Sequence, residues 1–97
     1  MIDPTFWWMR EQARRRYNSA ESDFHRFQQA VERLENTPRK LDLRNAYASL
    51  SFAAHDVLRA AREMELYGLS PSPQIVQAAR EYLSPAAEAE RRKKFRK

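Results

Sequence analysis

Apolar residues recur every three or four positions along the first third of the chain. From Ala13 to Leu34 the spacing alternates between four and three residues, and Phe6 extends the stripe toward the N-terminus. This heptad spacing predicts one long helix whose apolar stripe faces a partner helix. Asp3 as N-cap and Pro4 at the first helical position predict where the helix begins. Nothing in the sequence breaks it before Asn36-Thr37-Pro38.

A second stripe with the same spacing runs from Leu43 to Met64. We expect this helix to begin near Pro38 or Leu41 and to end at Gly68, because glycine commonly caps a helix C-terminus. The linker at residues 36–40 is short, so the two helices are predicted to pack as an antiparallel hairpin.

The two stripes specify a register for this hairpin. Folding at the linker places Leu34 opposite Leu43 and Phe24 opposite Ala54, and in most of the levels a large side chain meets a small one. The same register predicts two interhelical ion pairs, Glu35–Arg44 and Arg14–Glu65.

One flank of the hairpin is lined by small residues: Ala30, Ala46, Ala53 and Ala60. Small side chains allow another helix to approach closely. We expect either a third helix of this chain or a second protomer on this flank. Ser72-Pro73 and Ser84-Pro85 each read as an N-cap followed by a first-turn proline, and they predict a short third helix at about 73–83.

The predicted fold class is all-α: a long antiparallel, coiled-coil-like hairpin with a short third helix and a basic C-terminal helix or tail. The single glycine disfavours hairpin-rich β folds. Ninety-seven residues allow one domain. We assign residues 1–84 to the hairpin with its third helix and 85–97 to a basic extension that projects or frays, because it has few apolar residues to bury.

The net charge of +5 has its source in this extension. Residues 91–97, RRKKFRK, carry six of the eighteen basic residues and leave the rest of the chain nearly neutral. Such a run attracts phosphates without sequence preference, and an aromatic residue within it can stack on a base. The candidate nucleic-acid contacts, to DNA or RNA, are Arg91, Arg92, Lys93, Lys94, Phe95, Arg96 and Lys97. The alternative is a solubilising end.

Bulky apolar residues cluster at the N-terminal end of the first helix. Either Trp7 and Trp8 are sealed under the short third helix, with Met9 against Tyr67, or they form an exposed aromatic patch that binds a partner. The register turns Trp8 outward, and Phe52 and Leu66 also fall on outward positions. The candidate protein-interaction residues are therefore Trp7, Trp8, Met9, Phe52, Leu66 and Tyr67.

Several kinds of chemistry lack the residues they need. The chain has no cysteine, and His25 and His55 stand in no ligand pattern, so we expect no metal. No catalytic constellation, cofactor motif or small-molecule site is evident, and we expect no enzyme. No apolar run is long enough to span a membrane, and we expect a cytoplasmic protein.

Two functions follow from these features. The first is a helical protein–protein interaction module, such as an adaptor, inhibitor or assembly factor, whose partner is another protein or a second copy of itself. The second is a nucleic-acid-binding accessory protein that uses its basic tail.

Overall fold

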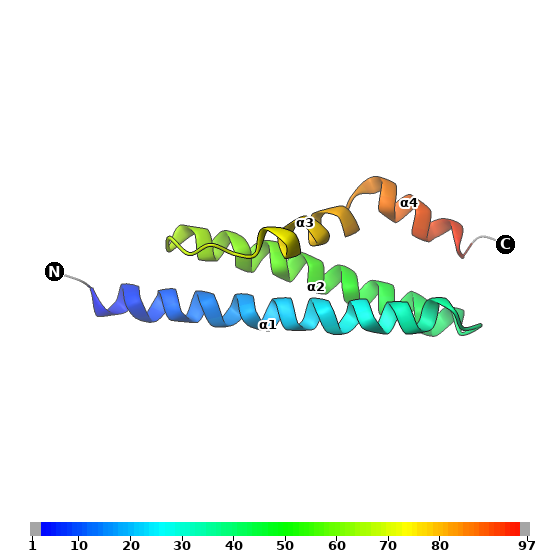
Figure 1. Cartoon of the computed structure of the whole chain (residues 1–97), viewed down its shortest axis with the longest axis horizontal. Coiled ribbons are helices and arrows are strands. Elements are labelled where there is room, and N and C mark those ends of the chain that lie inside the picture. The colour runs from blue at the N-terminus through cyan, green and yellow to red at the C-terminus, as the bar shows by residue number, and fades with distance from the viewer. Residues whose placement is uncertain (1–2, 96–97) are drawn as a thin grey trace.

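The computed structural model describes residues 3–95. In this range the chain forms four helices: α1 (Pro4–Glu35), α2 (Lys40–Leu66), α3 (Pro73–Tyr82) and α4 (Pro85–Lys93). Helices α1 and α2 lie antiparallel along the long axis, and α3 and α4 run back along α2 toward the linker (Figure 1). The molecule is a rod of 63 × 21 × 16 Å. The predicted all-α hairpin is confirmed.

The helix ends follow from local sequence. Asp3 Oδ1 accepts a hydrogen bond from the Thr5 N–H at 2.9 Å, which satisfies one of the free donors of the first turn of α1. After the end of α2, Gly68 adopts φ 74°, a left-handed conformation that glycine reaches without a side-chain clash. The Gly68 and Leu69 N–H groups donate to the carbonyls of Glu65 and Met64, at 3.1 and 2.9 Å.

The two apolar stripes form the core. Phe24 and Val57 are the largest fully buried side chains. Two cross-helix contacts agree with the predicted register near the open end: Arg16 pairs with Glu63, and Arg10 Nε donates to the Tyr67 carbonyl at 3.3 Å. Hydrophobic burial along both stripes therefore holds the arms of the hairpin together.

Both predicted interhelical ion pairs are wrong. Arg14 pairs instead with Glu11 at 3.5 Å, because a carboxylate one turn away on the same helix is within easy reach. Glu35 accepts hydrogen bonds from the Tyr47 hydroxyl and from Lys94. No pattern in the sequence predicts this approach of the C-terminal segment to Glu35.

The expectation that a third helix lies on the alanine flank is also wrong. Ala46, Ala53 and Ala60 are buried between α1 and α2, and the cleft beside Ala60 is lined only by residues of those two helices. Their small side chains let α1 itself come close enough to cover them. Helix α3 packs on the other flank, where the Tyr82 hydroxyl donates to the Tyr47 carbonyl at 2.9 Å.

The C-terminal extension forms α4, none of whose residues is buried, and it contacts the hairpin near its end, through Lys94 and Phe95. Ser84 Oγ accepts from the Ala87 N–H at 3.2 Å and begins α4, as its N-cap position predicts. The chain then returns toward the linker end of the hairpin (Figure 1). There the Phe95 ring meets the Tyr47 ring edge-on, with centroids 6.0 Å apart, so the extension partly buries one apolar side chain.

Candidate functional site

The first turns of α1 extend past the end of α2 and are covered by no other helix (Figure 1). They carry Phe6, Trp7, Trp8 and Met9, which are 42%, 47%, 65% and 40% exposed. Leu66, at the adjacent end of α2, is 82% exposed. We call these five residues the aromatic end.

The prediction that the third helix seals this end is wrong. The segment after Gly68 turns back along the hairpin before α3 begins, and the Ser72 N–H donates to the Tyr17 hydroxyl at 3.1 Å. Tyr17 lies almost three turns beyond Trp7, so α3 starts too far along the rod to cover the tryptophans. The alternative of an exposed aromatic patch is the one that the exposures support.

Contacts at the aromatic end fix some of its side chains. The Phe6 ring lies 5.7 Å from the Tyr67 ring and 6.1 Å from the Trp7 ring, centroid to centroid. Phe6 therefore lies against Tyr67, the residue that the sequence places beside Met9. The Arg10 guanidinium lies 5.1 Å from the Trp7 ring centroid while its Nε bonds the Tyr67 carbonyl. Trp8 points outward, as predicted.

Phe52 belongs to a different part of the surface. It is 74% exposed, as predicted, but it precedes Leu66 by fourteen residues in α2. That spacing corresponds to about 21 Å along the helix axis. The structure therefore does not bring Phe52 into the aromatic end.

Within the described residues, the basic tail is largely matched by carboxylates. Arg92 pairs with Glu88 at 2.7 Å, Lys93 with Glu90 at 3.0 Å and Lys94 with Glu35 at 3.3 Å. Arg91 alone among residues 91–94 has no ion pair. Arg96 and Lys97 lie outside the described residues.

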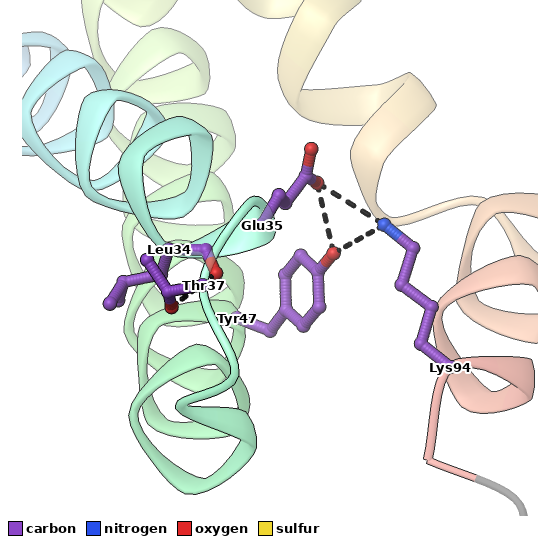
Figure 2. Close-up of polar contacts among 5 residues, drawn as sticks. All are labelled: Leu34, Glu35, Thr37, Tyr47 and Lys94. Atoms are coloured by element: carbon purple, nitrogen blue, oxygen red, sulfur yellow. Dashed lines mark hydrogen bonds and ion pairs between the residues drawn. The ribbon is translucent and has the colours of Figure 1, made fainter.

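A three-residue polar contact ties the end of α4 to the hairpin (Figure 2). The Tyr47 hydroxyl donates to Glu35 Oε1 at 3.0 Å and accepts from Lys94 Nζ at 2.8 Å. Burial raises the pKa of Tyr47, and the hydrogen bond with Tyr47 raises that of Lys94. Both shifts favour the protonated forms that make the contact. The one signal for this contact in the sequence is Phe95, an apolar residue within an otherwise cationic run.

A cleft of about 550 Å³ lies next to this contact, between α2, the end of α3 and α4. Arg44 and Arg91 line it, and each guanidinium lies over an aromatic ring: Arg44 over Phe95 at 5.5 Å and Arg91 over Tyr82 at 3.9 Å. Burial raises the pKa of Tyr82. No pattern in the sequence predicts this cleft, because its walls come from separate helices.

Metal ligands do not gather anywhere in residues 3–95. His25 lies 3.9 Å from Glu21 on the exposed face of α1, and His55 lies on the wall of the cleft. None of the helices in the described range is both long enough and apolar enough to cross a bilayer.

No family model, no curated protein and no solved structure matches this chain. Its function must therefore be inferred from its own surface.

Proposed function

We propose that this protein is a non-enzymatic helical protein–protein interaction module that self-associates through its aromatic end. One observation carries the proposal: Phe6, Trp7, Trp8 and Met9 are consecutive, large and 40–65% exposed on the uncovered turns of a long helix.

Side chains of this kind contribute strongly to binding. Trp and other aromatic residues dominate interface energetics because each can remove a large apolar area from water. Arg10 holds Trp7 through its position over the ring and its bond to the Tyr67 carbonyl. A pre-ordered side chain loses less conformational entropy on binding, so more of the burial energy stabilises the complex.

The partner that we propose is a second copy of the chain. At roughly 200 Å² for each large side chain, the exposed fractions leave about 550 Å² of apolar surface at the aromatic end. Two-fold pairing would bury this patch on both copies, a total of about 1,100 Å², near the lower limit for a specific interface. The expected dimer is therefore weak and concentration-dependent.

The nucleic-acid alternative has less support. Three of the four described tail cations already face carboxylates, and the end of α4 is folded against α2. Such exposed pairs cost little to break, so they lower the expected affinity for phosphates without abolishing it.

Tryptophan emission tests the proposal because Trp7 and Trp8 are the only two tryptophans of the chain. We expect emission typical of buried indole at high protein concentration and a shift toward the red on dilution. Trp8→Ala should move this transition to at least about tenfold higher concentration, since an aromatic anchor commonly contributes 2 kcal/mol or more.

Phe52→Ala is the matched control, because it removes a similarly exposed aromatic ring outside the aromatic end. It should leave the transition where it is in the parent chain. Emission from exposed indole at every concentration would refute self-association through this end, and an equal effect of Phe52→Ala would refute the assigned surface.

A further inference from the structure

The cleft beside the Tyr47 contact is lined by residues 44–55 in the first half of α2, which follows the linker, whereas the aromatic end lies at the opposite end of that helix. Its volume of about 550 Å³ falls within the range of small-molecule sites. Helix α2 supplies one wall and α4 with Phe95 supplies the other, so a molecule in the cleft would touch both.

The charges in this cleft do not balance. Three arginines line it, Arg44, Arg91 and Arg92, with one carboxylate, Glu88. Glu88 is matched by Arg92 at 2.7 Å. Among the described residues, neither Arg44 nor Arg91 has a carboxylate within ion-pair distance, and nearby Glu35 is bound to Tyr47 and Lys94. Two positive charges in one cleft are left without a counter-charge.

The two guanidinium groups are held by aromatic rings rather than by acceptors. Arg91 lies 3.9 Å from the centroid of Tyr82, whose hydroxyl is itself anchored to the Tyr47 carbonyl at 2.9 Å. Arg44 lies 5.5 Å from the centroid of Phe95. A guanidinium over a ring face keeps its N–H donors available for an anion. Both groups are thus positioned before any ligand arrives.

We propose that this cleft binds a small organic phosphate, with the phosphate dianion between Arg44 and Arg91 and an apolar or aromatic group against Leu83 and Phe95. Each guanidinium presents planar N–H donors that can bind two phosphate oxygens. A phosphate dianion neutralises the charges of both arginines, whereas a single carboxylate neutralises only one. An inorganic phosphate would fill only a small part of the cleft. The apolar wall of the cleft favours a ligand with an organic group beside the phosphate.

Calorimetric titration of the full chain tests this site, with adenosine monophosphate (AMP), inorganic phosphate and adenosine as probes. We expect saturable one-site binding of AMP, weaker binding of inorganic phosphate and none of adenosine. Arg44→Gln and Arg91→Gln should each weaken AMP binding by about tenfold or more, since each removes a charge-assisted hydrogen bond.

Arg59→Gln is the matched control, because it removes the same charge from an exposed position of α2 away from the cleft. We expect it to change AMP affinity by less than about twofold, as for a distant exposed charge at physiological salt. An equal loss in Arg59→Gln would overturn the proposal, because binding would then depend on overall charge.

Three other results would also overturn the proposal. The first is that neither AMP nor phosphate shows saturable binding. The second is that adenosine binds as tightly as AMP. The third is that an oligothymidylate binds far more tightly than AMP, because that result would indicate a nucleic-acid surface. Arg44→Gln keeps the test valid even if Arg91→Gln releases α4, because Arg44 lies on α2. Hydrogen exchange gives a second readout: AMP should slow amide exchange in residues 85–95 of the parent chain, and Arg44→Gln should need about tenfold more AMP or more for the same effect.

Discussion

Phe24 and Phe52 allow the same substitution to be compared at a buried and an exposed site of one hairpin. Phe24 is 1% exposed at the α1–α2 interface, whereas Phe52 is 74% exposed on α2. Phe24→Ala removes a buried ring and leaves a cavity, for which about 3–5 kcal/mol is typical. A chain of this size has a total stability of about 5–15 kcal/mol, so the loss is a large fraction of it.

Thermal unfolding followed by circular dichroism measures the difference between the two variants. At about 4–8 °C per kcal/mol, Phe24→Ala should lower the Tm by at least about 12 °C. Phe52→Ala should change stability by less than about 0.5 kcal/mol, with any change toward greater stability, because alanine is the better helix former. All samples need equal protein concentration, since self-association would raise the Tm. Equal losses in the two variants would refute the packing of α1 on α2.

Three further outcomes follow from individual contacts. Tyr47→Phe keeps the ring but removes the hydroxyl hydrogen bonds to Glu35 and Lys94, so amide exchange in residues 85–95 should become about five- to tenfold faster. Unchanged exchange would contradict the role of the Tyr47 hydroxyl in holding the C-terminal segment. Gly68→Ala should destabilise the fold by about 1–2 kcal/mol in urea unfolding, because alanine is strained at φ 74° even though no neighbouring atom lies within 4 Å of the added Cβ. An unchanged free energy of unfolding would contradict the capping role of Gly68. Burial raises the pKa values of Tyr17, Tyr47 and Tyr82 above 10.0. The free energy of unfolding should therefore be fully retained below pH 10 and should fall as the pH rises through the raised pKa values. A free energy of unfolding that stays constant in that pH range would count against the burial of these tyrosines.

The hairpin could be predicted because its information is local and repeated. Two stripes with heptad spacing, a short linker, Asp3-Pro4 and Gly68 all specify the same pair of helices, and each acts within a few residues along the chain. The outward positions of Trp8, Phe52 and Leu66 followed from the same periodicity.

The arrangement of α3 and α4 could not be predicted in the same way. The sequence places α3 as a helix, but which flank of α2 it covers depends on how closely α1 approaches Ala46, Ala53 and Ala60. The docking of Phe95 on Tyr47 joins residues almost fifty positions apart, without a shared period. The cleft arises from that docking, so the arginines around it appeared in the sequence only as separate charges.

The aromatic end lies at the start of α1 and the end of α2, whereas the cleft is lined by the first half of α2, the end of α3 and the C-terminal segment. The aromatic end is apolar and fits a protein surface, whereas the cleft is cationic and fits a small anion. Because no residue contributes to both, substitutions at one site should leave the other unchanged, and each proposal can fail without the other.

Sedimentation equilibrium over a wide range of protein concentration tests self-association through the aromatic end most directly. The chain has a mass of 11.5 kDa. We predict an average mass that rises toward twice this value as concentration increases, and a Trp8→Ala variant whose rise in mass needs at least about tenfold higher concentration. A constant 11.5 kDa for the parent chain at every concentration would contradict the proposed function.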